Sequence, residues 1–449
     1  MTGSVMFKVM AVFVIVLFLI SGFSVIAFGS HNLENNLNLS SKVSKNNFNY
    51  NNAAKNNFSA LSQNNNFTNA GYVKYTLILW NNTLLNGNVA NIIINLKPSG
   101  IVYDASNGYL YVTDANSNNI AIINSLTNTG IKTIPVGSDP EGAAFDPSNG
   151  YIYVTNWASD NVSVINGATN SILKTIPVGL YPEGILYDPF NGYIYVTNWA
   201  SDNVSVINGA TNSIVATIQV GSGPMGMTFD SSNEYIYIAD SVSYDISVIN
   251  GSTNYVIEKI HVGSVSYAQG GGPFGAAFDP SNGYIYVTNS ANNDLAVING
   301  STNSIVATIP VEIYPELAAF DPSNGYIYVT NPINDDVTVI NGVTNTIIAT
   351  IPVGSDPEGI AFDPFNGYLY VTNFASDNVS VINDATNSIL KTIPVGLHPI
   401  GVAFDSSNGY IYVTNGNSEN VSVINGETNT IIATIPIKSY PIGIGYPNG

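Results

Sequence analysis

Carboxylate and aromatic side chains recur in this chain at spacings that could build a binding site. Each of four glutamates follows a proline, and each of three aromatic residues follows the sequence Val-Thr-Asn. Carboxylate oxygens are ligands for calcium, and aromatic faces attract cations or stack on sugars. The two sets therefore predict a carbohydrate or cation site, unless duplication copied them without a binding role. The glutamates are Glu141, Glu183, Glu316 and Glu358, and the aromatic residues are Trp157, Trp199 and Phe374.

A repeated tetrapeptide, Tyr-Val-Thr-Asn or a close relative, sets the positions of these residues. The interval between successive copies is 42 residues, except for 49 residues between Tyr237 and Tyr286. A period of this size indicates one supersecondary unit copied many times. The eight copies begin at Tyr111, Tyr153, Tyr195, Tyr237, Tyr286, Tyr328, Tyr370 and Tyr412.

The second copy contains four predicted strands, over residues 142–146, 151–155, 162–166 and 172–178. Asn-Gly turns separate the first from the second and the third from the fourth. The first strand has small residues, as an axis requires, whereas Lys174 and Pro177 mark the last as an edge. These features predict an all-β fold, a β-propeller of four-stranded antiparallel blades. A right-handed solenoid is the competing repeat fold.

Eight complete copies predict eight blades. Residues 440–446 begin a ninth inner strand, and residues 73–80 and 89–96 resemble the outer strands of an earlier copy. A nine-bladed ring with a partial closing blade is therefore the alternative. The seven extra residues after the fourth copy fall within 264–274, where three successive glycines predict an exposed excursion.

The repeat resembles a known family. The run Phe-Asp-Pro-Ser-Asn-Gly-Tyr-Ile-Tyr-Val-Thr-Asn, followed by Val-Ser-Val-Ile-Asn-Gly and Ala-Thr-Ile-Pro-Val-Gly, is similar to the YVTN-type propeller repeat of archaeal surface-layer and other cell-surface proteins. The resemblance covers roughly residues 99–437. It implies an extracellular propeller associated with envelope structure or adhesion, and it carries over no catalytic residues.

In a propeller, the loop leading into each inner strand lies on the same face as the loop between the second and third strands. The glutamates are therefore expected near the axis, with the aromatic residues outside them. Copies 2 and 3 are neighbours, whereas copies 6 and 7 lie on the opposite sector. The corresponding positions of copies 4, 5 and 8 hold Met225, Phe274 and Ile400.

The N-terminal part predicts export. Residues 9–28 are almost entirely apolar and follow Lys8, which is typical of a membrane-spanning helix or a cleaved signal peptide. Residues 30–71 are Asn-rich and predict a disordered linker. The predicted domains are 1–29 (signal peptide or N-terminal membrane anchor), 30–71 (linker) and 72–449 (propeller). The predicted location is the cell surface or the extracellular space.

Composition excludes several classes of function. The chain has no cysteine, its eleven basic residues are all lysine, and its formal net charge is −19. Thiolate metal sites are therefore excluded, and the charge argues against binding to nucleic acid. His31, His261 and His398 are too few and too far apart in an eight-bladed ring for a triad or a multi-histidine metal site.

The predicted function is a noncatalytic scaffold for adhesion, envelope contact or ligand binding, with an envelope protein or glycan as partner. No cofactor is expected, although calcium is possible. The alternative is an exported propeller enzyme, either a carboxylate-based hydrolase or a quinone-dependent dehydrogenase.

Two further sets of residues recur. An aspartate after each inner strand is expected to accept hydrogen bonds from its own turn rather than to hold calcium. Asn-x-Ser sequences at the start of third strands predict glycosylation. The aspartates are Asp104, Asp146, Asp188, Asp230, Asp279, Asp321, Asp363 and Asp405, and the glycosylation candidates are Asn161, Asn203, Asn378 and Asn420.

Overall fold

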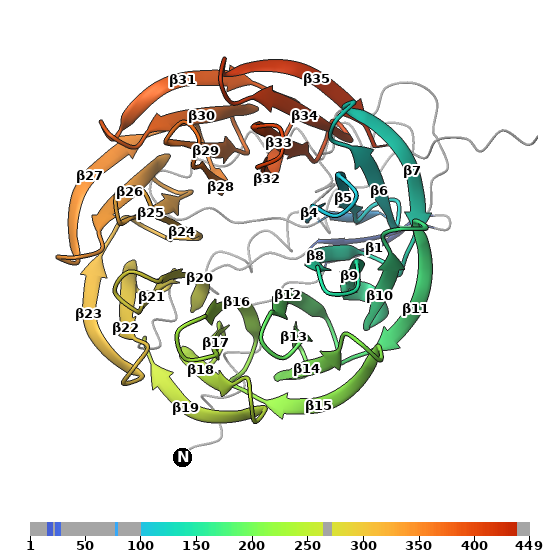
Figure 1. Cartoon of the computed structure of the whole chain (residues 1–449), viewed down its shortest axis with the longest axis horizontal. Helices are drawn as coiled ribbons and strands as arrows, with labels where there is room; N and C mark the ends of the chain where they lie inside the picture. Colours follow the sequence, from blue (N-terminus) through green and yellow to red (C-terminus); the bar gives the residue numbers. More distant parts are fainter. Residues whose placement is uncertain (1–15, 21–22, 28–76, 80–99, 264–271, 438–449) are drawn as a thin grey trace, which may run out of the picture. The chain divides into compact units, whose positions relative to one another are not determined.

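The computed structural model describes residues 16–20, 23–27, 77–79, 100–263 and 272–437 (Figure 1). The chain divides into two compact units, Met1–Asn95 and Leu96–Gly449. The second unit contains eight four-stranded antiparallel sheets arranged as the blades of a ring. The predicted propeller fold is therefore confirmed, and the solenoid is wrong.

Each of the first four blades contains four consecutive strands of the chain. In blade 1 they are β4 (Ile101–Asp104), β5 (Tyr109–Asp114), β6 (Asn119–Asn124) and β7 (Thr129–Pro135). In blade 2 they are β8 (Pro140–Asp146), β9 (Tyr151–Asn156), β10 (Asn161–Asn166) and β11 (Ser171–Pro177), with a 3₁₀ turn at Trp157–Ser159. In blade 3 they are β12 (Pro182–Asp188), β13 (Tyr193–Asn198), β14 (Asn203–Asn208) and β15 (Ser213–Gln219). In blade 4 they are β16 (Pro224–Asp230), β17 (Tyr235–Asp240), β18 (Asp245–Asn250) and β19 (Tyr255–His261).

The other four blades repeat this order. In blade 5 they are β20 (Pro273–Asp279), β21 (Tyr284–Asn289), β22 (Asp294–Asn299) and β23 (Ser304–Pro310). In blade 6 they are β24 (Ala318–Asp321), β25 (Tyr326–Asn331), β26 (Asp336–Asn341) and β27 (Thr346–Pro352). In blade 7 they are β28 (Pro357–Asp363), β29 (Tyr368–Asn373), β30 (Asn378–Asn383) and β31 (Ser388–Pro394). In blade 8 they are β32 (Pro399–Asp405), β33 (Tyr410–Asn415), β34 (Asn420–Asn425) and β35 (Thr430–Pro436).

The hydrophobic core is divided among the spaces between neighbouring blades. The second strand is buried on both faces, because one face packs on the preceding blade and the other on the following blade. Tyr153 is fully buried, and its Oη donates to Asn212 Oδ1 in the next blade at 2.7 Å. The tyrosine of the tetrapeptide is thus a structural residue that joins each blade to its neighbour.

The threonine of the tetrapeptide also joins two blades. Thr155 Oγ1 accepts a hydrogen bond from the amide of Gly142 in its own blade at 2.8 Å. The same hydroxyl donates to the backbone carbonyl of Glu183 in the next blade at 3.0 Å. Equivalent contacts fix the backbone at the start of the inner strands of blades 2, 3, 4, 6 and 8, which in blades 2, 3 and 6 carries a glutamate.

The recurrent aspartate acts in its turn, as predicted. Asp146 Oδ1 accepts from the backbone amide of Ser148 at 2.9 Å and from its hydroxyl at 2.6 Å. Asp146 Oδ2 accepts from Asn149 Nδ2 at 2.6 Å. The carboxylate therefore holds the turn between the first and second strands together.

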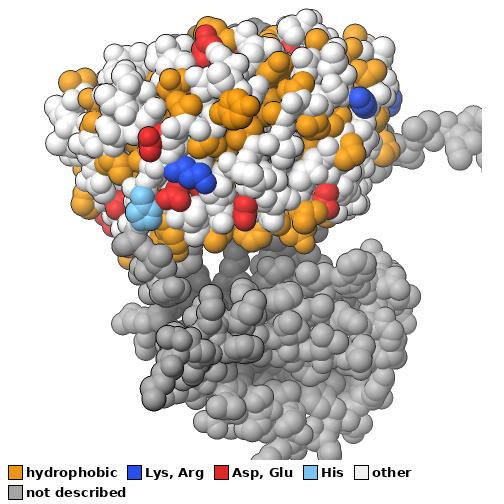
Figure 2. Space-filling view, turned by 90° about the horizontal axis from the view of Figure 1, so that it is seen from below, with side chains coloured by type: hydrophobic (Ala, Val, Ile, Leu, Met, Phe, Trp, Pro, Cys, Tyr) orange, Lys and Arg blue, Asp and Glu red, His pale blue; other side chains and the backbone are white. Residues whose placement is uncertain are grey.

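The outer strands form the wall of the ring, of which Figure 2 shows one side with many apolar and few charged side chains. Every described outer strand contains a β-bulge, and the extra residue is aliphatic and 41–49% exposed. A bulge distorts an edge and hinders pairing with another chain. The bulged residues are Ile131, Leu173, Val215, Ile257, Val306, Ile348, Leu390 and Ile432.

Blades 1 and 8 meet through the same contacts as any other pair of neighbours. Tyr412 Oη donates to the carbonyl of Ser125 at 3.0 Å and to Asn128 Oδ1 at 2.9 Å. Buried side chains of the two blades form one cluster. Eight blades therefore close the ring, and the nine-bladed alternative is wrong. Of its proposed closing segments, residues 440–446 and 89–96 lie outside the described residues.

The N-terminal unit is described only in part. β1 (Val16–Ile20) pairs antiparallel with β2 (Phe23–Ala27), which pairs with β3 (Leu77–Leu79). The prediction of an apolar helix over residues 9–28 is thus wrong for its described residues, because valine, isoleucine and phenylalanine favour strands. None of the helices among the described residues is long and apolar enough to cross a membrane. The linker over 30–71 and the excursion at 264–271 lie outside the described residues.

Candidate functional site

Two sets of loops form one face of the ring. We call the loop between the second and third strands of a blade its 2–3 loop, and the loop leading into its inner strand its connecting loop. In blade 2 the amide of Trp157 donates to the carbonyl of Asp139 at 2.8 Å, which joins the two loops. In blade 3 the amide of Trp199 donates to Tyr181 at 2.9 Å. The prediction that these loops share a face is therefore confirmed.

The residue before the proline has a left-handed backbone in the connecting loops of blades 2, 3, 4, 6, 7 and 8. Its φ is +56° at Tyr181, +59° at Tyr314, +53° at His398 and +65° at Gly223. Non-glycine residues rarely adopt this conformation. Tyr181, Tyr314 and His398 therefore adopt it at a cost in backbone free energy.

At two of these positions, Tyr181 and His398, the aromatic side chain stacks on a ring in the 2–3 loop of the preceding blade. The ring of Trp157 stacks on Tyr181 with centroids 4.2 Å apart and planes 11° apart. Phe374 stacks on His398 in the same way, at 4.3 Å and 18°. In both blades, therefore, an aromatic ring in the 2–3 loop is covered by an aromatic ring from the next connecting loop.

Trp199 lacks this cover in the part of the chain that the structure describes. Its counterpart in the next connecting loop is Gly223, and Trp199 is 37% exposed. A Cβ built on Gly223 would lie 3.1 Å from Trp199 Nε1 and 2.5 Å from a methyl carbon of Val242. Glycine at this position thus leaves room for the indole in its observed place.

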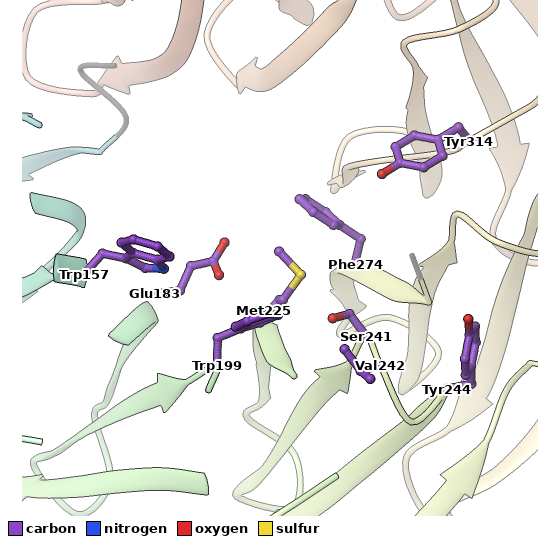
Figure 3. Close-up of a pocket in the computed structure, with 9 residues that line it drawn as sticks. All are labelled: Trp157, Glu183, Trp199, Met225, Ser241, Val242, Tyr244, Phe274 and Tyr314. Atoms are coloured by element: carbon purple, nitrogen blue, oxygen red, sulfur yellow. The ribbon is translucent and has the colours of Figure 1, made fainter. Parts of the chain in front are cut away.

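A cleft of about 540 Å³ opens beside Trp199, and we call it the aromatic cleft (Figure 3). Aromatic side chains, one methionine and one valine supply most of its wall, with one carboxylate and one serine. Its residues come from the 2–3 loops of blades 2–4 and from the starts of the inner strands or connecting loops of blades 3–6. They are Trp157, Glu183, Trp199, Met225, Ser241, Val242, Tyr244, Phe274 and Tyr314.

The cleft brings together some of the predicted site residues and leaves others outside. Trp157, Glu183 and Trp199 line it, whereas Glu141 does not. Phe374 lies in blade 7, where it covers His398. Of the four predicted residues of copies 2 and 3, the cleft thus brings three together.

The negative charges of the glutamates of blades 6 and 7 affect Tyr314, one of the residues that line the cleft. Burial raises the pKa of Tyr314, and the negative charges of Glu316 and Glu358 raise it further. Both carboxylates are therefore close enough to Tyr314 for their charges to be felt. The face combines aromatic surface with negative potential.

A buried carboxyl lies below the loop that carries Ser241. Burial raises the pKa of Asp240 to about 7, opposed in part by the hydroxyl of Ser247, which donates to Asp240 Oδ2 at 2.6 Å. Asp240 replaces the asparagine found at this position in six of the other blades. In residues 100–263 and 272–437, no three His, Cys, Asp or Glu side chains are grouped as ligands for a metal ion.

The histidines occupy separate places. His261 Nδ1 lies 2.9 Å from Asp245 Oδ1 in blade 4, and His398 leads into blade 8. Neither lines the aromatic cleft. These two histidines thus belong to blades 4 and 8.

The glycosylation candidates stand at the first positions of third strands, as predicted. Asn203 is only 9% exposed, and its Nδ2 donates to the carbonyl of Ser201 at 3.1 Å. Asn161, Asn378 and Asn420 make the same contact in their blades. A glycan on any of them would replace one of the two Nδ2 hydrogens, and their modification stays a prediction.

Six residues of the cleft were absent from the predicted site. Met225 and Phe274 occupy the glutamate position in copies 4 and 5, so alignment of the copies could have found them. Tyr314 corresponds to Tyr181, the residue that covers Trp157. The position of Tyr314 in the repeat, rather than its residue type, could therefore have predicted that it lies near the site.

The ring is similar to several solved structures at low sequence identity. Dihydro-heme d1 dehydrogenase NirN in complex with DHE matches with a TM-score of 0.65 and 13% identity, over 77% of this chain and 76% of that chain. Hydrazine synthase from Kuenenia stuttgartiensis matches with a TM-score of 0.53 and 20% identity, over 76% and 99%. Apo AztD from Citrobacter koseri matches with a TM-score of 0.55 and 15% identity, over 74% and 95%.

No family model and no curated protein matches the chain. At these identities the structural matches show the eight-bladed β-propeller fold alone. Two of the similar structures are named as enzymes, and they assign no activity to this chain.

Proposed function

We propose that the protein is a noncatalytic cell-surface propeller that binds a ligand or envelope component through its 2–3 loop face. The observation that carries this proposal is the aromatic cleft, where Trp157, Glu183 and Trp199 meet although they come from two different repeats. The resemblance of the repeat to YVTN-type surface propellers and the apolar segment at residues 9–28 support the external location.

The residues repeated in every blade supply structure rather than chemistry. The tetrapeptide tyrosine and threonine bond to the next blade, and the recurrent aspartate bonds to its own turn. The positions that line the cleft, in contrast, hold different residues in different copies. Variation at a loop face on a constant frame is typical of binding proteins.

The test is binding of the purified full-length protein to native envelope material in a sedimentation assay. The Trp157→Ala/Trp199→Ala variant should lose binding, because it removes two large contact surfaces. The control is Phe190→Ser, on the opposite face, where copy 2 has Ser148. Phe190 is 58% exposed, so its loss should leave both folding and binding unchanged. Equal binding by the tryptophan variant would contradict the proposal.

The four glutamates provide a second test of the same face. Replacing Glu141, Glu183, Glu316 and Glu358 by glutamine reduces repulsion among negative charges and should preserve or increase stability. The same change should abolish binding if their charge attracts the ligand. Binding equal to that of the parent would favour duplication without function.

Surface location is tested by labelling intact cells with an amine reagent that does not cross membranes. The expected result is modification of Lys132, Lys174 or Lys391, each on an outer strand of the ring. Labelling only after lysis would contradict the external location.

A further inference from the structure

We propose that the aromatic cleft binds an organic cation, an ammonium group bearing methyl or other apolar substituents, and that Trp199 is the ring that receives it. This inference rests on the proposed function of the 2–3 loop face as a binding surface. It adds the chemical class of the ligand and the residue that selects it.

Comparison of blades inside the chain identifies Trp199. Trp157 and Phe374 occupy the same position in their own 2–3 loops, and each is covered by a stacked ring, Tyr181 or His398. At Trp199 the covering residue is Gly223. Both indoles border the cleft, but among the described residues Trp199 has Gly223 where Trp157 has a stacked ring.

The absence of a side chain at Gly223 determines how closely its neighbours pack in the wall of the cleft. A Cβ there would meet both Val242 and the indole nitrogen of Trp199. In the preceding connecting loop the equivalent residue is Tyr181, and Val242 corresponds to Ala200. Copy 4 thus differs at two positions that contact one another, glycine for tyrosine and valine for alanine.

The composition of the cleft selects its ligand. Indole and phenol faces carry negative electrostatic potential and attract cations, most strongly when water is excluded. Met225 and Phe274 add apolar surface, and Glu183 adds the one carboxylate of the lining. In Figure 3 the side chains of Glu183, Met225 and Phe274 point toward a common space.

Other ligands fit this wall less well. Calcium takes six to eight oxygen ligands, and most of the lining is aromatic or aliphatic. An anion would meet Glu183 and no lysine of the lining.

The experiment uses choline as the probe and 3,3-dimethyl-1-butanol as its neutral isostere, with isothermal titration calorimetry on the full-length protein. Choline should bind at least about tenfold more tightly than the isostere, since a desolvated cation–π contact contributes about 2 kcal/mol. Calcium chloride should give no binding at this cleft. Equal affinity for choline and the isostere would overturn the inference.

The decisive variant is Gly223→Tyr/Val242→Ala, which gives copy 4 the residues that copy 3 has at these positions. It should cover Trp199 as Tyr181 covers Trp157, and abolish choline binding while all of the indoles remain. Trp199→Ala should also lose binding, whereas Phe374→Ala in blade 7 should bind as the parent does. Glu183→Gln should weaken choline binding without changing the affinity for the isostere.

The melting temperature of each variant separates loss of the site from loss of the fold. Choline binding that persists in folded Gly223→Tyr/Val242→Ala would overturn the role of Trp199. If the parent binds envelope material but not choline, the organic-cation inference fails while the proposed function stands. If neither binds, both fail.

Discussion

Trp157 and Tyr181 stack face to face across the boundary between blades 2 and 3, with planes only 11° apart. Tyr181 keeps a left-handed φ of +56° to place its ring there. The loops of neighbouring blades are thus connected by side chains as well as by their inner strands. The same arrangement of Phe374 and His398 shows that it belongs to the repeat.

The first prediction concerns this stacked pair. In a double-mutant cycle with Trp157→Ala and Tyr181→Ala, we expect a coupling free energy of about 0.5–1.5 kcal/mol, the usual value for a stacked aromatic pair. Urea unfolding followed by circular dichroism measures it. Additive effects of the two changes would show that the rings contribute only through their separate burial.

The second prediction concerns the buried tyrosine hydroxyls. Tyr153→Phe removes the hydrogen bonds to Gly209 O and Asn212 Oδ1 and leaves a buried amide oxygen without this donor. We expect a loss of about 1–3 kcal/mol in the free energy of unfolding. Tyr255→Phe is the control, since Tyr255 is 72% exposed and its change should cost less than about 0.5 kcal/mol.

The third prediction concerns blade 4, where Ala239 replaces the tetrapeptide threonine. In blade 3, Thr197 Oγ1 accepts from the amide of Gly184 at 2.8 Å and donates to the carbonyl of Met225 at 3.0 Å. Ala239→Thr should recreate both contacts and raise the free energy of unfolding by about 0.5–1.5 kcal/mol. Thr155→Ala should lower it by a comparable amount, and a destabilising Ala239→Thr would show that blade 4 has no room for the hydroxyl.

The fourth prediction is a pH dependence of stability. The folded pKa of Asp240 is about 7, above its ordinary value of 3.8, because burial disfavours the charged form. The group therefore favours the folded state most at acidic pH, and this contribution is lost as the pH rises through about 7. Asp294 and Asp336, with pKa values raised by burial to about 6, act in the same direction.

Asp240→Asn tests this dependence directly. Blade 6 has asparagine at this position, and Asn331 Nδ2 donates to Asp336 Oδ1 at 2.7 Å. The variant should be more stable than the parent by roughly 2–4 kcal/mol at pH 8.5, with little difference at pH 4. Glu427→Gln, at an exposed turn, should change stability at neither pH. A constant difference between parent and Asp240→Asn from pH 4 to 8.5 would exclude titration of Asp240 as its cause.

The sequence alone predicted the strands within each blade and favoured eight blades, and closure between blades 1 and 8 excluded the ninth. The tetrapeptide tyrosine recurs in all eight copies, at a spacing of 42 residues with one exception, because every blade needs the same buried residue between its two neighbours. The inner, middle and edge strands differ in residue size, in alternation and in the presence of proline or lysine. These are local properties of β-structure and can be read along the chain.

The site depended on contacts between copies, which no single copy contains. The recurrence of Trp157 and Trp199 predicted two equal members of one set, whereas the structure gives them different surroundings. Tyr181 covers one ring, whereas the other has Gly223 in the position of the covering residue, and both border the cleft. The contacts between copies depend on ring closure and on the backbone of the connecting loops. A side chain in a connecting loop contacts the 2–3 loop of the preceding blade, not that of its own blade.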